Sequence, residues 1–320
     1  MPAMQAKLAR VRRILKRQAK AAWGKDYVPA IFATPAEAPR CSRPTILRPK
    51  KLGQRDMHLL SGVEGTVAIL ALFHPNVWDI HEQHMLSTEP TAHPLASHPS
   101  TLGTQLPRIE GTVKVANRLG KLSWHGKVYA EDIAKWVPDI YVGDLLLFCT
   151  DDAGPYCING TVKATAEDFR HPGPRLHGKP RRAPSERTLF RHDLEAAYFD
   201  DVMIRTQRIA GDEIDSTLAF NLEHLFGRHA RKVNLADEVR EELLDAFNGA
   251  IGGNTSAFSL VRELAARFSA PIDEVCNVLY QGIWHRRLRV DLFSPIVIDK
   301  PLRREVRDPL DVYSSWFVRQ

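Results

Sequence analysis

The sequence predicts a mixed α/β core followed by an α-rich C-terminal region. An apolar helical pattern over residues 56–72 precedes several short apolar segments typical of β-strands. From Glu186 onward, apolar residues recur at helical spacing instead. The 320 residues are long enough for two domains, so this order predicts an α/β domain followed by a helical one.

A basic arm opens the chain. Residues 1–25 contain eight Lys or Arg and no acid, whereas the whole chain has 44 basic and 38 acidic residues. Leu8, Val11 and Leu15 recur at helical spacing, which predicts an amphipathic helix when the arm is bound or docked. Such an arm suits a polyanion such as DNA, because each phosphate contact releases counterions; a membrane-surface helix is the alternative. Five of its cations are candidate DNA contacts: Arg10, Arg12, Arg13, Lys16 and Arg17.

The segment after the arm is predicted to be extended and to lead into the core. Five prolines fall between residues 29 and 55, which favours a connector without regular structure. We expect a helix over 56–72, because Pro75 bars its continuation, and then a strand over 77–83. Residues 84–107 are rich in Pro, Thr, Ser and His and are expected to form a long loop.

Two apolar segments, 144–148 and 156–163, are separated by turn-forming residues and predict a β-hairpin. A loop rich in proline and arginine is expected over 170–191. Within it, Arg181 and Arg182 are candidate DNA contacts that would grip phosphates beside a cut site. A solvated surface loop explains them equally well, and the sequence leaves both interpretations open.

The C-terminal region is predicted to end in a winged helix-turn-helix. Longer helices are expected at 186–200, 212–227 and 235–250. Two short helices, 259–268 and 272–280, are separated by a turn with Pro271, and a strand-like segment follows at 287–292. This order is typical of winged helices. Arg286 and Arg287, on the expected wing, are candidate DNA contacts, although winged helices also bind proteins.

These patterns divide the chain into a basic arm with connector (1–55), an α/β core that includes the basic loop (56–230) and a winged-helix domain with a tail (231–320).

No apolar run is long enough to span a membrane. The four cysteines lie far apart, which argues against a disulfide framework and favours a reducing compartment such as the cytoplasm. The histidines between residues 74 and 98 match no common zinc spacing.

Glu64, Asp144 and Lys163 are the residues best placed to carry chemistry. Asp144 opens the first strand of the hairpin and Lys163 ends the second, so pairing of the strands brings them together. Glu64, Asp144 and the Val162 carbonyl would form a hard oxygen site of the kind that Mg2+ prefers. A lysine beside such a metal can hold the attacking water in phosphodiester hydrolysis. Solvated surface groups have the same spacing and are the commoner case, and Asp139 is an alternative to Asp144.

Longer stretches of sequence carry a family resemblance. A Ser-x-x-Glu element at 61–64 is followed by a strand that reads Val-x-Asp-Ile-x-Glu-Gln up to Gln83. Related segments occur at 111–112, 141–146, 194–199 and 221–225, with a weaker one at 159–163. Together they cover most of residues 25–300 and resemble the TnsA family, the endonuclease subunits of heteromeric bacterial transposases.

The resemblance implies a restriction-endonuclease-like core, with a mixed sheet flanked by helices, followed by a winged-helix domain. It implies that Glu64, Asp144 and Lys163 are catalytic, and that Glu64, Asp144 and the Val162 carbonyl bind Mg2+, for which Mn2+ would substitute. Possible neighbours of the site are Ser61, Gln83 and Thr161. Thr161 departs from the wider nuclease superfamily, which usually has an acid two residues before the lysine.

The function implied by the resemblance is hydrolysis of a phosphodiester in the 5′ strand at transposon ends during cut-and-paste transposition. The implied partners are double-stranded DNA, a TnsB-like transposase that handles the 3′ strand and a TnsC-like ATPase. The implied location is the bacterial cytoplasm, at the nucleoid when the complex is assembled. Two alternatives are a catalytically inactive module that bridges DNA, transposase and ATPase, and a stand-alone restriction or repair nuclease.

Overall fold

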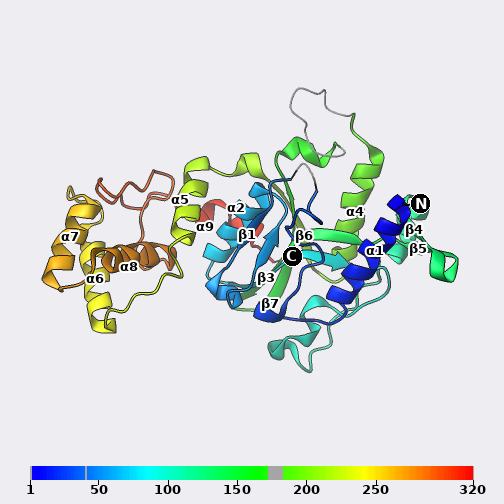
Figure 1. Cartoon of the computed structure of the whole chain (residues 1–320), viewed down its shortest axis with the longest axis horizontal. Coiled ribbons are helices and arrows are strands. Elements are labelled where there is room, and N and C mark those ends of the chain that lie inside the picture. The colour runs from blue at the N-terminus through cyan, green and yellow to red at the C-terminus, as the bar shows by residue number, and fades with distance from the viewer. Residues whose placement is uncertain (1, 40–41, 172–182, 320) are drawn as a thin grey trace. The chain divides into compact units, whose positions relative to one another are not determined.

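The computed structural model describes residues 2–39, 42–171 and 183–319, which form two compact units (Figure 1). Unit 1 comprises the residues up to 68, residues 76–213 and the residues from 316 onward. Unit 2 comprises residues 69–75 and 214–315. The helical unit therefore takes in residues from 214, whereas the sequence placed the start of the C-terminal domain at residue 231.

A four-stranded mixed sheet forms the centre of unit 1. In spatial order its strands are β3 (Val77–Leu86), β6 (Tyr141–Asp151), β7 (Gly154–Lys163) and β8 (Arg205–Ala210). The β3–β6 and β6–β7 pairs are antiparallel, and β8 is parallel to β7. A parallel pair needs a crossover, and here it contains α4 (Glu186–Asp200). The expected α/β architecture, a mixed sheet with helices, is confirmed.

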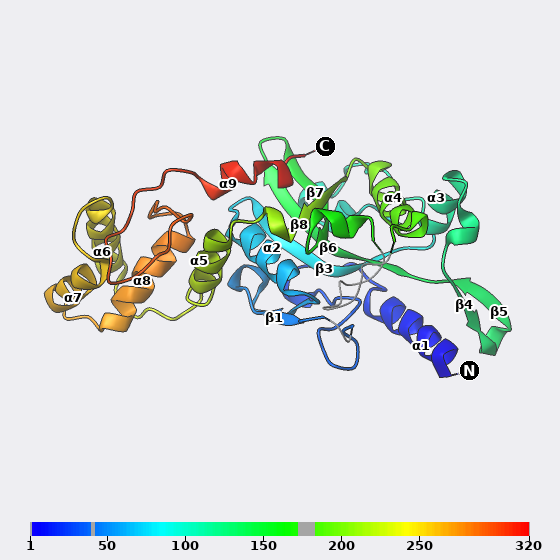
Figure 2. The same ribbon diagram turned by 90° about the horizontal axis from the view of Figure 1, so that it is seen from above.

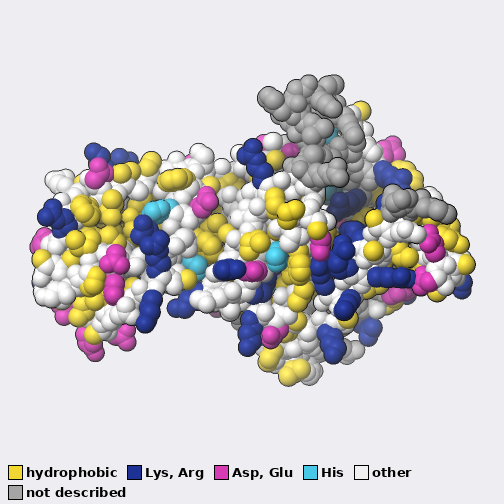
Figure 3. Space-filling model, in the orientation of Figure 1, with side chains coloured by type: hydrophobic (Ala, Val, Ile, Leu, Met, Phe, Trp, Pro, Cys, Tyr) yellow, Lys and Arg dark blue, Asp and Glu magenta, His cyan; other side chains and the backbone are white. Residues whose placement is uncertain are grey.

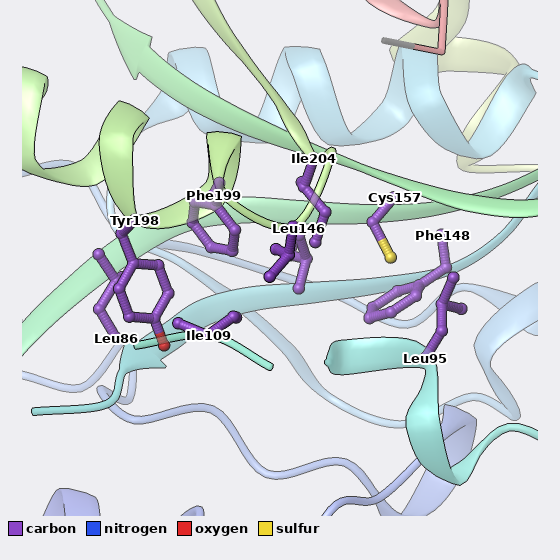
Figure 4. Packing of buried hydrophobic residues seen from close by; sticks show 10 residues of the cluster. Leu86, Leu95, Ile109, Leu146, Phe148, Cys157, Tyr198, Phe199 and Ile204 are labelled. Carbon is purple, nitrogen blue, oxygen red and sulfur yellow. The ribbon is translucent and has the colours of Figure 1, made fainter. Parts of the chain in front are cut away.

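Both faces of the central strand β6 are buried. Leu146 and Phe148 belong to one buried cluster with Tyr198 and Phe199 of α4. Leu146 lies beside Phe199, and Phe148 lies beside Cys157 and Leu95 (Figure 4). The alternate residues Leu145 and Leu147 point to the other face and are also buried. Each such side chain contributes about 1.5–3 kcal/mol on burial, so this strand supplies much of the core.

The remaining elements of unit 1 surround this sheet. They are α1 (Pro2–Arg17), β1 (Thr45–Leu47), β2 (Met57–Leu59), α2 (Gly62–Phe73, whose last turn belongs to unit 2), α3 (Thr112–Arg118), β4 (Lys127–Ala130) and β5 (Lys135–Pro138). β1 and β2 pair with each other, as do β4 and β5. The β4–β5 ribbon lies beside α1 (Figure 2).

The basic arm forms the helix that the sequence predicts, and Leu8 and Val11 of the predicted apolar face pack on the core. Val11 and Ile14 of α1 are buried against Val128 and Ile140. Leu15, which we assigned to the apolar face, is 47% exposed. Ile14, three residues after Val11, is buried in place of Leu15, so the buried face of the helix continues through Ile14.

Unit 2 is helical, and its expected wing strand is not formed. Its helices are α5 (Ser216–Phe226), α6 (Asp237–Ala250), α7 (Ala257–Arg267), α8 (Ile272–Trp284) and α9 (Pro309–Val312). Segment 287–292 has one isolated bridge, from Val290 to Arg304, instead of a strand. Among the described helices, none combines the length and apolar character that crossing a bilayer requires.

Other departures from the prediction have local causes. The helix predicted over 56–72 begins only at Gly62, because residues 57–59 pair with β1. Within 84–107, β3 continues to Leu86. Among the described elements that the sequence did not predict are α3, α9 and the strands β1, β2, β4, β5 and β8. β8 follows α4 directly and reads Arg-Thr-Gln-Arg-Ile-Ala, so its polar residues conceal a strand.

Candidate active site

Asp144, Val162 and Lys163 meet at the open end of the β6–β7 hairpin. The regular pairing of these strands ends at Leu145 and Gly160. Just beyond it, Asp144 Oδ2 accepts a 2.8 Å hydrogen bond from the Val162 N–H, and Lys163 Nζ lies 3.9 Å from the same oxygen. Because the N–H and C=O of one strand residue point toward the same side, the Val162 carbonyl also faces the side of Asp144.

Glu64 lies in the first turn of α2 and is surrounded by neutral hydrogen-bond donors. Its Oε2 accepts from the Leu60 N–H at 2.9 Å and from Gln83 Nε2 at 3.0 Å, and the Ser61 hydroxyl lies 3.1 Å from Oε1. Ser61 Oγ in turn accepts from the Glu64 N–H at 3.1 Å and caps the helix. The Ser-x-x-Glu element thus starts α2 and also fixes the Glu64 carboxylate, which is only 7% exposed.

Gln83 adopts a strained backbone conformation within β3. Its φ is +48°, which makes it the one described non-glycine residue with positive φ that lies inside a strand. Such a conformation costs about 1–3 kcal/mol and is characteristic of functional sites. In the β3–β6 ladder Gln83 lies opposite Asp144, between two regular pairs. Gln83 therefore connects Glu64 on α2 with the strand position that faces Asp144.

The charges at this site are unbalanced. Burial, together with the negative charge of Asp144, raises the pKa of Glu64 to about 7. Hydrogen bonds from Leu60 and Ser61 and the charge of Lys163 lower the Glu64 pKa, but they do not offset the burial. Glu64 and Asp144 thus share Lys163 as a nearby cation. In the protein without metal, Glu64 takes up a proton as the pH falls through about 7.

A third carboxylate, Glu195 of α4, lies close to the same strand end. Its Oε1 accepts hydrogen bonds from Asn159 Nδ2 at 3.0 Å and from Thr161 Oγ1 at 3.2 Å. Glu195 is buried, and burial followed by the charge of Asp144 raises its pKa. Thr161 therefore directs its hydroxyl to the Glu195 carboxylate.

The sequence analysis did not identify Glu195 as a site residue. A signal was present, because Glu195 lies one residue after Leu194 and four before Phe199, both of which are buried on α4. A glutamate on the buried face of a helix is unusual and indicates a polar partner inside the protein.

Two buried histidines lie near Asp144, but neither is suited to accept a proton at neutral pH. Burial lowers the pKa of His84 to about 4, and burial followed by the charge of Lys163 lowers that of His192 to about 4. The His84 ring packs on Gly143, where an added Cβ would come within 2.3 Å of it. This close approach explains why glycine precedes Asp144.

The donor set fits a hard divalent cation. Glu64 and Asp144 supply carboxylate oxygens, and the Val162 carbonyl faces the same side. In the described part of the chain, no three His, Cys, Asp or Glu side chains are arranged to hold a metal ion by themselves. Mg2+ does not require such a cage, because it usually binds one or two carboxylates and keeps water and phosphate as its other ligands.

Most of the candidate DNA-binding residues of the arm form ion pairs within unit 1. The pairs are Arg10–Asp139 (3.2 Å), Arg12–Asp132 (2.6 Å), Arg13–Glu37 (3.5 Å) and Arg17–Glu37 (2.7 Å). The bond from Arg17 is the main reason that the pKa of Glu37 falls to about 2. Lys16 forms no ion pair with any described residue. Figure 3 shows Lys and Arg side chains beside acidic ones on the face over α1.

The two arginines expected on the wing also form ion pairs. Arg286 makes a two-pronged contact with Asp308 at 3.0 and 2.6 Å, and Arg287 binds Glu241 at 3.3 and 2.6 Å. Arg181 and Arg182 lie outside the described residues. The structure therefore brings Glu64, Asp144, Val162 and Lys163 together with Ser61 and Gln83, and leaves the DNA-binding predictions open.

Comparison with known proteins adds no family assignment, because no family model and no curated protein matches the chain.

Proposed function

We propose that this chain is a Mg2+-dependent DNA endonuclease of the TnsA type. The observation that carries the proposal is the buried Glu64 carboxylate, which lies beside Asp144 and has neutral donors in place of a cation. A buried carboxylate that no cation bonds directly is costly, and such groups with shifted pKa values concentrate at functional sites. A divalent ion would balance the charges of Glu64 and Asp144.

The side chains of the site have separate roles in this proposal. Glu64, Asp144 and the Val162 carbonyl would hold the ion, which lowers the pKa of a bound water and stabilises negative charge on phosphorus. Lys163 would hold the attacking water or balance the charge of the phosphate. Ser61 and Gln83 fix the two oxygens of Glu64 at 3.1 and 3.0 Å, which preorganises the carboxylate.

The architecture supports the finer fold assignment that we propose, a restriction-endonuclease-like core. The order along the chain is α2, β3, β6, β7, α4 and β8, with α3, β4 and β5 inserted between β3 and β6. Asp144 lies on β6, the middle of the three antiparallel strands, and Lys163 on β7. In unit 2, α6, α7 and α8 are followed by an antiparallel contact in which the Asp291 N–H donates to the Arg303 carbonyl at 3.0 Å. This short ribbon supports the proposal of a winged helix.

The proposed substrate is double-stranded DNA at transposon ends, cut on the 5′ strand. A TnsB-like transposase and a TnsC-like ATPase are the proposed partners, in the bacterial cytoplasm. Several arginines of α1 are engaged with acids of the same unit, so the proposal assigns sequence recognition to the transposase. The arm would contact phosphates, which position a protein on DNA without reading its sequence.

The direct test is plasmid nicking in Mg2+ or Mn2+ by the chain together with a TnsB-like transposase and a TnsC-like ATPase. Asp144→Ala should abolish nicking and leave thermal unfolding and partner binding unchanged. Asp139→Ala is the matched control, because Asp139 is bonded to Arg10 and should be dispensable for the chemistry. Nicking retained by Asp144→Ala would refute the assignment.

The same assay separates the alternatives. A bridging module without chemistry would show neither nicking nor metal binding that depends on Asp144. A stand-alone nuclease would cut at its own preferred sequence without the transposase and ATPase.

A further inference from the structure

The segment after α1 runs along β3, which is an edge strand of the sheet. Its backbone and side chains bond to this strand at successive positions. The Gly24 N–H donates to Asp79 Oδ2 at 2.7 Å, and the Ala30 N–H donates to the Gln83 carbonyl at 2.8 Å. Residues 18–30, which span the end of the arm and the start of the connector, therefore cover the edge of β3 at the level of the candidate active site.

Gln18, the first residue after α1, joins the arm to this strand through both ends of its side-chain amide. Its Oε1 accepts from the Met85 N–H at 2.7 Å. Its Nε2 donates to the Tyr27 hydroxyl at 2.9 Å and to the Val28 carbonyl at 3.1 Å, and it lies 3.5 Å from the Gln83 carbonyl. The Tyr27 hydroxyl itself donates to the Glu82 carbonyl at 2.8 Å. The Glu82 carbonyl before Gln83 and the Met85 N–H after it are thus both bonded to residues of the segment 18–30.

These bonds explain how the strained conformation of Gln83 persists. A non-glycine residue with positive φ is retained only where its surroundings determine its conformation, and an edge strand has a free side on which to relax. Here residues 18–30 occupy that side. They donate hydrogen bonds to the carbonyls of Glu82 and Gln83 and accept one from the Met85 N–H. With this backbone conformation, the Gln83 side chain reaches Glu64, and its Nε2 donates to Glu64 Oε2 at 3.0 Å.

We propose that Gln18 is a positioning residue of the active site, which acts through Gln83 on Glu64. This inference rests on the proposed function, because it assumes that Glu64 binds a metal ion. It gives the arm a role in addition to DNA contact: docking of α1 completes the metal site. Displacement of the arm would release the Gln83 backbone and weaken the hold on Glu64.

Metal affinity tests the proposal in the full chain. Mn2+ binding, measured by calorimetry and by electron paramagnetic resonance, should weaken by about five- to tenfold in Gln18→Ala, the size of one lost hydrogen bond. Gln18→Glu keeps the acceptor for the Met85 N–H and removes the donor, so it should lose affinity as well. Gln5→Ala is the matched control, because Gln5 lies on α1 and contacts the exposed Glu131.

A double-mutant cycle distinguishes positioning from a general loss of structure. If Gln18 acts through Gln83, the variant Gln18→Ala/Gln83→Ala should bind Mn2+ as Gln83→Ala alone does. Independent losses that multiply in the double variant would contradict the proposal, as would wild-type affinity in Gln18→Ala.

A second measurement needs no metal. In protein labelled with 15N-glutamine, the Gln83 side-chain amide should exchange slowly with solvent in the wild type and several-fold faster in Gln18→Ala. Unchanged exchange would overturn the positioning role, whether or not metal binds. Absence of Mn2+ binding by the wild type, with faster Gln83 exchange in the variant, would instead refute the proposed function and leave the structural link intact.

Discussion

Two buried glutamates near the start of the core show how differently this protein treats negative charge. Glu82 is completely buried and accepts two hydrogen bonds from Arg55, at 2.7 and 2.8 Å, and one from the His58 N–H. Glu64 is almost as buried, yet its donors are the neutral groups of Leu60, Ser61 and Gln83. One carboxylate is matched by an arginine and the other lies beside a second carboxylate.

This difference in partners indicates different roles for the two carboxylates, a structural one for Glu82 and a functional one for Glu64. Arg55 also donates to the Ile80 carbonyl at 2.6 Å, so the Arg55–Glu82 pair ties the connector to β3. Nothing comparable neutralises Glu64. Burial raises the pKa of both carboxyls, but at Glu82 the hydrogen bonds and charge of Arg55 oppose the rise, whereas at Glu64 the charge of Asp144 adds to it. We infer that the Arg55–Glu82 pair supports the fold, whereas the Glu64 site is complete only with a cation.

The largest effect is expected from breaking the matched pair. Arg55→Leu leaves Glu82 buried without a counterion, so the free energy of unfolding should fall by about 3–5 kcal/mol. Urea titration followed by circular dichroism measures this loss. The double variant Arg55→Leu/Glu82→Leu should recover much of it, because no isolated charge remains. An equal loss in both variants would show that the pair contributes more than charge balance.

Removing the charge of Glu64 should have the opposite effect and increase the free energy of unfolding above neutral pH. The pKa of Glu64 rises on folding from 4.5 to about 7, so the folded state binds the extra proton and stability falls as pH rises through this window. The shift corresponds to about 3 kcal/mol at most. In EDTA, Glu64→Gln should therefore be more stable than the wild type at pH 8 and equally stable below pH 4.5. Chemical denaturation at the two pH values measures the difference, and a destabilised variant at pH 8 would contradict it.

Metal should remove the disadvantage of the unmatched site. At a free concentration one hundred times its dissociation constant, Mn2+ should stabilise the wild type by about 2.7 kcal/mol. Because protons compete for Glu64, this stabilisation should decline as pH falls below about 7. Differential scanning calorimetry with Mn2+ or EDTA measures it. Asp144→Asn is expected to show no Mn2+-dependent shift, and a shift that survives would place the ion elsewhere.

The smallest effect on stability is expected at an exposed pair. Arg12 and Asp132 lie 2.6 Å apart, with more than half of each side chain exposed. Arg12→Ala should change the free energy of unfolding by less than about 1 kcal/mol. If the arm contacts phosphates, the same variant should lower the slope of log affinity for DNA against log salt concentration by about one. An unchanged slope would show that Arg12 makes no phosphate contact.

The sequence predicted the centre of the fold well, because its strands are strongly apolar. The hairpin that carries Asp144 and Lys163 was expected from two apolar segments and a turn, and it is present as β6 and β7. The ribbon β4–β5 and the strand β8 were missed because they are short or polar. The expected wing strand at 287–292 is reduced to a single bridge, so an alternating pattern was not sufficient there.

The candidate site was predictable from local pattern only where the pairing of neighbouring strands determines distance. Pairing of two adjacent strands brings Asp144 near Lys163, and that consequence follows from the sequence alone. The role of Gln83 depends on a positive φ, and that of Glu195 on which face of α4 meets β7. Both depend on tertiary packing, which local periodicity does not encode.

Anomalous scattering from a crystal grown with Mn2+ tests the central claim most directly. The account predicts a peak coordinated by Glu64, Asp144 and the Val162 carbonyl, and its loss in Asp144→Asn. An ordered structure with Mn2+ in solution and no peak at these three groups would contradict the account.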